Sequence, residues 1–187
     1  MRMEQQLEHI IEGCKQNKRQ SQEQLYKYCF EQMMKVCLRY HTNMDDAAAS
    51  YNTAMYNVFV KINQYKNQGE FFGWVRRIMV NTCLNAIKQN AKFEAVEISD
   101  KEYQSFTIKP EAYSSLDSKE ILALVQSLPT TCKLVFNLNQ MEGFSHEQVA
   151  EHLNISPGTS KWYLHEARKI LKEKIQNMQH NEIRKNA

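Results

Sequence analysis

The stretch that decides the fold is 144–169, with the sequence FSHEQVAEHLNISPGTSKWYLHEARK. Its pattern predicts two short helices with a tight corner between them. The hydroxyl of Ser145 can accept a hydrogen bond from a free backbone N–H in the first turn of the first helix. Asn154 tolerates the left-handed conformation that ends a helix, and Pro157 suits the first position of the next helix, with Ser156 as its cap. These signals together predict a helix-turn-helix.

The two helices also have distinct faces. Val149, Ala150 and Leu153 lie on one side of the first helix, and Leu164 and Leu171 lie on one side of the second. The other side of the second helix carries Lys161, Trp162, His165, Arg168 and Lys169. A helix-turn-helix with such a face can place its second helix in a DNA major groove. Similar helix pairs also occur as plain packing motifs, so evidence from the rest of the chain is needed to distinguish a DNA-binding motif from a packing motif.

The composition is typical of a folded helical protein. The chain has 187 residues, of which 42% are hydrophobic, with only five Gly and three Pro, and this favours long helices with few turns. No run approaches the ~20 apolar residues that a membrane span needs, and the first residues lack the apolar core of a signal peptide. We therefore expect a cytoplasmic protein without membrane insertion.

The sequence offers no recognisable enzyme or metal chemistry. The five cysteines form no CxxC pair, so we expect reduced, buried thiols. The six histidines are scattered without an HxxxH pair, and there is no P-loop, GxGxxG or GxSxG motif. We expect no catalytic residue, no metal and no cofactor. Residues 1–90 and 119–187 carry a small basic excess, which suits nucleic acid but also an ordinary solvated surface.

Helical spacing of apolar residues predicts helices along most of the chain. The predicted helices cover 3–15, 21–41, 45–62, 71–90, 118–128, 132–143, 145–153 and 157–178. We expect Ser21 to cap the second of these helices, residues 63–70 to form a polar loop, and the tail 180–187 to fray.

The helical period is lost between residues 91 and 118, where polar and acidic residues predict a flexible linker. The sequence therefore predicts an all-α chain of two small helical domains, 1–90 and 119–187, joined by the linker 91–118.

Two motifs resemble conserved segments of bacterial sigma factors. Residues 72–82, FGWVRRIMVNT, resemble their F-x-x-W-L-x-x-I-x-x-N run. Residues 128–136 and 142–171 resemble their C-terminal region, with its LP start, its E-G-x-S-x-x-x-(I/V)-A-x-x-L and its S-x-G-T…L-x-x-A-R-x-x-L. The chain thus resembles the extracytoplasmic function (ECF) group of the sigma-70 family, which keeps regions 2 and 4 and lacks regions 1.1 and 3.

The resemblance implies a function for each predicted domain. Region 2, residues 1–90, is expected to bind core RNA polymerase and open the promoter −10 element. Region 4, residues 119–187, is expected to recognise the −35 element through the helix-turn-helix. Core polymerase and promoter DNA are the implied partners, and the family also admits an anti-sigma factor.

The resemblance and the chemistry of the side chains give three sets of candidate residues. The candidates for −35 DNA are Ser156, Thr159, Lys161, Trp162, His165, Glu166 and Arg168. The candidates for −10 DNA are Tyr65, Arg76, Arg77, Asn81, Asn85 and Lys88. The candidates for core polymerase are Thr53, Tyr56, Asn57 and Lys61. Lys161 can reach a guanine acceptor or a phosphate, Arg168 suits a phosphate, and the N–H groups after Ser156 can hold another phosphate.

Alternatives stay open at the level of residues and of function. Lys161 and Arg168 also fit a solvated face, and Trp162 also fits core packing, because Ser160 replaces the family's usual apolar residue. Residues 53–57 lack the family's usual acidic pattern. Two other classes of protein stay open for the whole chain: a helix-turn-helix regulator that acts without polymerase, and a protein-binding adaptor.

Overall fold

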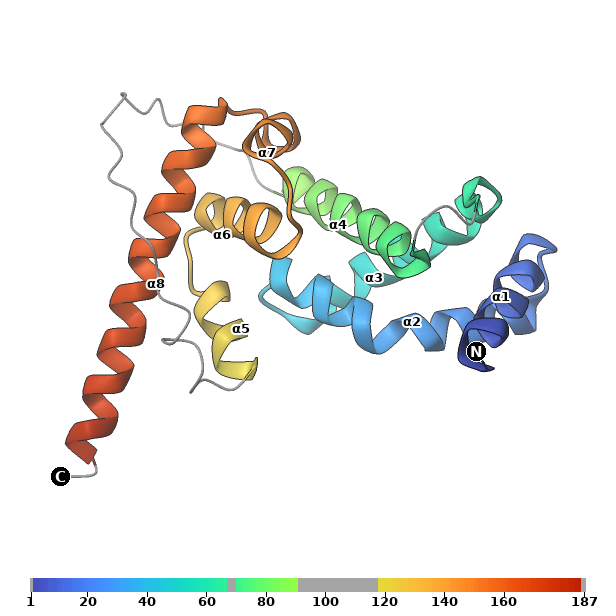
Figure 1. The fold of residues 1–187 in the computed structure, drawn as a ribbon, viewed down its shortest axis with the longest axis horizontal. Coiled ribbons are helices and arrows are strands. Elements are labelled where there is room, and N and C mark those ends of the chain that lie inside the picture. The colour runs from blue at the N-terminus through green and yellow to red at the C-terminus, as the bar shows by residue number, and fades with distance from the viewer. Residues whose placement is uncertain (1, 67–69, 91–117, 186–187) are drawn as a thin grey trace. The chain divides into compact units, whose positions relative to one another are not determined.

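A computed structural model describes residues 2–66, 70–90 and 118–185. Its elements are α1 (Arg2–Lys15), α2 (Arg19–Tyr40), α3 (Met44–Lys61), the 3₁₀-helix η1 (Ile62–Gln64), α4 (Phe71–Asn90), α5 (Ser118–Gln126), α6 (Thr130–Phe136), the π-helix η3 (Asn137–Met141), α7 (His146–Leu153) and α8 (Pro157–Lys185) (Figure 1). Within these residues every regular element is helical, so the predicted all-α class is confirmed.

The chain divides into two compact units, Met1–Glu94 (unit 1) and Ala95–Ala187 (unit 2). The predicted linker 91–118 lies outside the described residues, except for Ser118, the first residue of α5. The assignment of one function to each unit stays a prediction.

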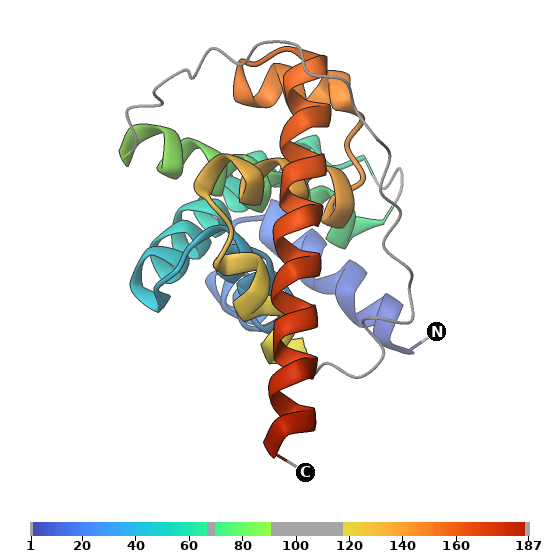
Figure 2. The same cartoon turned by 90° about the vertical axis from the view of Figure 1, so that its left-hand side faces the viewer.

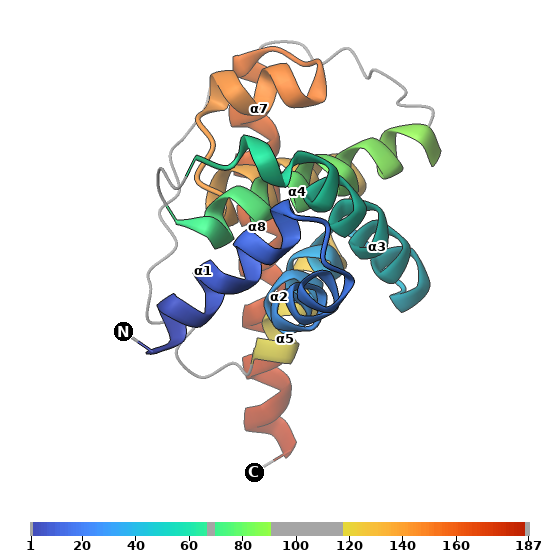
Figure 3. The same ribbon diagram turned by 90° about the vertical axis from the view of Figure 1, so that its right-hand side faces the viewer.

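Helix α2 is the central helix of unit 1, because it packs against α1, α3 and α4 (Figure 3). Helices α3 and α4 also pack directly on each other. The core between them holds large side chains that solvent hardly reaches; among them are Leu25, Tyr40, Tyr51, Met55, Val58, Val75 and Met79. Burial of such side chains, at about 1.5–3 kcal/mol each, is the main force that holds the helices together.

The prediction that Ser21 caps α2 is wrong. Helix α2 begins at Arg19, so Ser21 lies inside the helix, where it is buried. The reason is a close crossing of the two helices: a Cβ atom on Gly13 would overlap the Ser21 side chain. Asn17 makes the turn with a left-handed backbone, φ 56°. Ser21 is therefore needed as a small side chain that lets α1 and α2 approach at Gly13, and not as a helix cap.

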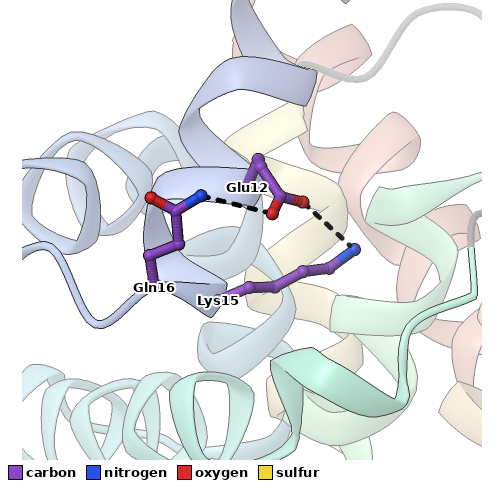
Figure 4. Close-up of polar contacts among 3 residues, drawn as sticks. All are labelled: Glu12, Lys15 and Gln16. Carbon is purple, nitrogen blue, oxygen red and sulfur yellow. Dashed lines mark hydrogen bonds and ion pairs between the residues drawn. The ribbon is translucent and has the colours of Figure 1, made fainter.

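The surface of α1 carries weak polar contacts (Figure 4). Glu12 accepts a hydrogen bond from the Gln16 amide at 3.4 Å and lies 3.7 Å from the Lys15 ammonium. Exposed pairs of this kind contribute little to stability, typically about 0–1 kcal/mol. The position of α1 is therefore set by its buried face, which includes Ile10, Ile11 and Cys14.

Helices α6 and α7 of unit 2 pack against the long helix α8 (Figure 2). Leu134, Leu138, Val149, Leu164 and Leu171 are buried in this unit. Helix α8 continues to Lys185, beyond the predicted end at 178, and the fraying of residues 180–187 stays a prediction. The chain has no Gly or Pro after Gly158 to end the helix.

Candidate nucleic-acid interface

The corner of the helix-turn-helix is fixed by local capping, as the sequence predicts. Ser145 and Gln148 form a capping box, in which Ser145 Oγ accepts from the Gln148 N–H and the Gln148 side chain accepts from the Ser145 N–H. Asn154 ends α7 with a left-handed backbone, φ 55°. Ser156 Oγ then accepts from the Thr159 N–H at 3.0 Å, which caps α8. These caps set the direction in which α8 leaves the corner.

A buried polar contact joins the two helices of the motif. Ser160, which is fully buried, lies 2.9 Å from the Nδ1 atom of His146, the first residue of α7. The space that a larger apolar residue would fill is thus used for a hydrogen bond. Burial, together with the nearby Lys161 ammonium, lowers the pKa of His146, so the imidazole is neutral at neutral pH.

Ser156 lies directly before α8 and the other −35 candidates lie within α8, and the set differs in exposure. Ser156 and Lys161 are exposed, whereas the other five candidates are half-buried: Thr159, Trp162, His165, Glu166 and Arg168. The Trp162 ring packs edge-on against Tyr163, with centroids 5.0 Å apart. Trp162 therefore has part of its surface in packing and part available to a ligand.

Arg168 is held by a residue that the sequence did not single out. Its guanidinium donates to Gln140 Oε1 at 3.0 Å. Gln140 lies in the π-helix η3, and its neighbour Asn139 donates to the Phe144 carbonyl at 2.8 Å. No sequence signal indicated this contact, because the π-helical turn of 137–141 departs from the 3.6-residue period on which the sequence prediction rests.

The −10 candidates of α4 lie on a basic and amide-rich surface of unit 1. Arg77, Asn85 and Lys88 are exposed, and Arg76 and Asn81 are half-buried. Their side chains provide cations and amides of the kinds that contact phosphates and base edges.

Tyr65 is buried, although the sequence predicts a polar loop at this position. Its side chain is only 8% exposed, because its ring packs edge-on against Phe71 at 5.1 Å and beside Trp74 at 5.5 Å. The prediction of a polar loop is therefore wrong at this residue, whose ring leaves little surface for a base. Residues 67–69 of the loop lie outside the described residues.

The candidates for core polymerase lie on α3 and at its end. Tyr56 is 67% exposed, Thr53 and Lys61 are also exposed, and Asn57 is half-buried. Thr53 and Asn57 line a surface pocket of about 330 Å³ that α3 and α4 border; its other lining residues include His41, Asp46, Ser50, Thr82, Asn85 and Gln89. The pocket thus lies between the core-polymerase candidates and the −10 candidate Asn85.

Comparison with known proteins shows which family the chain resembles. Residues 118–171 match the model of sigma-70, region 4. An ECF RNA polymerase sigma-E factor of Haemophilus influenzae is 25% identical over 126 residues, which cover 62% of this chain and 67% of that protein. These matches support the sigma-70 family for this chain, as its sequence motifs predict. The helix-turn-helix lies within the segment that matches region 4, and the similar proteins are ECF sigma factors.

Further relatives agree with this assignment. The ECF RNA polymerase sigma factor SigE of Mycolicibacterium smegmatis is 23% identical over 158 residues, or 82% of this chain. The match spans 61% of the length of that relative. The sigma factor RpoE of Bartonella quintana, solved in complex with the anti-sigma factor NepR, covers 81% of this chain with a TM-score of 0.50 and 19% identity. That likeness supports the fold.

The functional class predicted for this sigma factor is confirmed, and a regulator acting without polymerase is not favoured. Members of the sigma factor family are in general not enzymes. The described residues hold no cluster of three or more His, Cys, Asp or Glu side chains that would suit a metal ion. In the same part of the chain, no helix combines the length and apolar character that crossing a membrane requires.

Proposed function

We propose that this sigma factor binds core RNA polymerase and directs it to promoters, with unit 1 opening the −10 element and unit 2 recognising the −35 element. The observation that carries the proposal is the capped helix-turn-helix of α7 and α8, which lies within the segment that matches region 4. Its second helix presents a basic and aromatic face, and the corner holds that helix in one direction.

The −35 element would lie against the first turns of α8. Lys161 is exposed on the second turn, where a recognition helix contacts base edges. Arg168, two turns later, would contact a phosphate. The Ser156 hydroxyl already caps the helix, so a phosphate near the corner would be held by backbone N–H groups and the Thr159 hydroxyl.

The −10 element would lie along α4. Asn81 and Asn85 are one turn apart and can present two amides to unpaired bases. The cations Arg76, Arg77 and Lys88 would contact phosphates of the same strand. Tyr65 would support the −10 site indirectly, because its ring packs against Phe71 and Trp74 at the start of α4 and does not itself contact a base.

Core polymerase would bind the exposed side of α3, at Thr53, Tyr56, Asn57 and Lys61. The middle of this side carries no acidic residue, because Asp45 and Asp46 lie in the first turn of the helix. The contact would therefore depend on the Tyr56 ring and on amide and hydroxyl groups more than on ion pairs. Such a contact should lose little strength as the salt concentration rises.

Two further parts of the proposal concern cellular context. An anti-sigma factor could control this chain, since the RpoE relative was solved with one. We also place the chain in the cytoplasm as a non-enzymatic factor, because core polymerase and promoter DNA are its proposed partners.

Run-off transcription with purified core polymerase tests the proposed function. Core polymerase with this chain should make a transcript from a promoter selected from the bacterial genome by the assembled holoenzyme. Core polymerase alone should not make it. The double variant Lys161→Ala, Arg168→Ala should lose −35-dependent transcription, whereas Lys172→Ala, an exposed cation further along α8, serves as the control. The absence of a transcript together with a strong shift of duplex DNA by the chain alone would favour the regulator instead.

A further inference from the structure

Three side-chain hydrogen bonds run in series in unit 2, from the corner before α7 to Arg168 on α8. Asn139 Nδ2 donates to the Phe144 carbonyl at 2.8 Å, and Gln140 Nε2 donates to Asn139 Oδ1. The Arg168 guanidinium donates to Gln140 Oε1 at 3.0 Å. We call this series, Phe144–Asn139–Gln140–Arg168, the amide relay. It connects the π-helix η3 both to the corner and to α8.

The chemistry of its two ends fixes the direction of the relay. A backbone carbonyl can only accept, so Asn139 has to turn its NH₂ group toward Phe144 and its oxygen toward Gln140. A guanidinium can only donate, so Gln140 has to turn its oxygen toward Arg168 and its NH₂ group toward Asn139. Flipping either amide would bring two acceptors together on one side and two donors together on the other. Each amide therefore has one orientation that satisfies the series.

The Phe144 end of the relay is held by contacts of its own. The Phe144 N–H donates to the Leu138 carbonyl of η3 at 3.0 Å. The Phe144 ring packs edge-on against His152 of α7, with 5.0 Å between centroids. The relay therefore starts at a residue whose position is set by both η3 and α7.

The Arg168 end of the relay keeps most of its hydrogen-bonding capacity. A guanidinium has several N–H donors, so the bond to Gln140 leaves enough of them for a bidentate contact with a phosphate. Burial lowers the pKa of His146, and the nearby charges of Lys161 and Arg168 lower it further. Both cations therefore lie near His146, the first residue of α7.

The bond between Gln140 and Arg168 adds little to the stability of the free chain, because it is exposed to water. A DNA backbone laid against Arg168 would exclude water from this bond. A hydrogen bond is stronger in such a medium of lower dielectric constant. The relay is therefore better suited to the bound state than to the folding of unit 2.

We propose that the amide relay positions Arg168 for one phosphate of the −35 element, with Gln140 as the residue that orients the guanidinium. The proposal rests on the proposed function and adds two positioning residues outside α8, Asn139 and Gln140. A long side chain that is already ordered loses less conformational entropy on binding, and ordering one such side chain changes affinity by about 2- to 10-fold. π-Helical turns are also frequent at functional sites.

Two matched variants separate this role from a general effect of the substitution. Gln140→Met keeps the length of the side chain and removes both the donor and the acceptor. Gln176→Met makes the same change at another exposed glutamine of unit 2, further along α8 and outside the relay.

The test uses the full chain assembled with core polymerase and a promoter that this holoenzyme transcribes. Each phosphate of the −35 element in turn is replaced with a neutral methylphosphonate, and the loss of affinity at each position is measured. Arg168→Ala should erase the loss at one position, which identifies the phosphate that Arg168 contacts. Gln140→Met should weaken binding to the unmodified promoter about 2- to 10-fold and reduce the loss at that same position alone. Gln140→Met should have no further effect when added to Arg168→Ala, and Gln176→Met should change nothing.

Five results would overturn the relay. They are a Gln140→Met affinity equal to that of the parent, an equal weakening by Gln176→Met, and a further loss when Gln140→Met is added to Arg168→Ala. The others are a Gln140→Met effect at all phosphates or at a different one, and no phosphate whose loss Arg168→Ala erases. The melting temperature of each variant shows whether it is folded. A parent holoenzyme that neither binds nor transcribes the promoter would instead refute the proposed function.

Discussion

Replacing Ser160 with alanine should loosen the helix-turn-helix of unit 2. The change removes the contact of 2.9 Å between the Ser160 hydroxyl and His146 Nδ1. One neutral hydrogen bond contributes about 1 kcal/mol net. Ser160 is fully buried but His146 is only half-buried, so water can reach part of the imidazole. The full cost of about 1–3 kcal/mol for an unsatisfied buried group should therefore not apply. We expect the free energy of unfolding of unit 2 to fall by about 1 kcal/mol.

The two tryptophans allow this change to be assigned to one unit. Trp162 lies in α8 and Trp74 lies in α4. A urea titration followed by the two indole N–H signals in NMR spectra reports the units separately. In Ser160→Ala the midpoint for Trp162 should fall, while the midpoint for Trp74 stays the same.

A double-mutant cycle separates the hydrogen bond from other effects of the substitution. His146→Gln removes the imidazole, and its combination with Ser160→Ala should cost less than the sum of the single changes, by about 1 kcal/mol. A coupling energy below about 0.3 kcal/mol, the usual error of additivity, would refute the reasoning. So would a Ser160→Ala chain as stable as the parent.

Three further predictions concern the DNA surfaces and pH. Asn81→Ala should change the stability of unit 1 by no more than about 0.5 kcal/mol, yet cost about 1–3 kcal/mol of promoter discrimination that a pre-melted bubble does not restore; equal transcription from every −10 variant would contradict this. Lys161→Ala should weaken binding of holoenzyme to the −35 duplex and reduce its salt dependence, and an unchanged salt slope would argue against a phosphate contact. Unit 2 should lose stability as the pH falls from 7 to 5, since burial and Lys161 lower the pKa of His146 and the unfolded chain then binds the proton more readily. The same urea titration in His146→Gln should show a weaker dependence on pH.

The elements that the sequence predicted well depend on neighbouring residues. The caps at Ser145 and Ser156 and the left-handed Asn154 need only a few adjacent residues, and all three occur as expected. The helix 71–90 also begins and ends where the apolar spacing indicates. The region 4 motif could therefore be located from the sequence alone.

The differences arise where distant residues meet. Serine is a common helix cap, but Ser21 is a small buried side chain that the close crossing of α1 and α2 at Gly13 requires. Tyr65 lies in a polar stretch of sequence, yet its ring is buried because it packs against Phe71 and Trp74. The hydrogen bond from Arg168 to Gln140 depends on a π-helical turn, for which the sequence holds no simple signal. Each of these contacts needs the fold before it can be inferred.

The burial of the cysteines gives this chain a built-in measure of how often each unit opens. All five thiols are free and buried, and burial raises the pKa of Cys14 and of Cys132 to about 11. The thiolate is the form that attacks alkylating reagents and oxidants, so these buried groups react slowly while the helices stay closed. Cys132 belongs to unit 2, and the remaining four belong to unit 1. The rate at which Cys132 is labelled therefore reports how often unit 2 opens, and the labelling rates of the other four cysteines report the opening of unit 1.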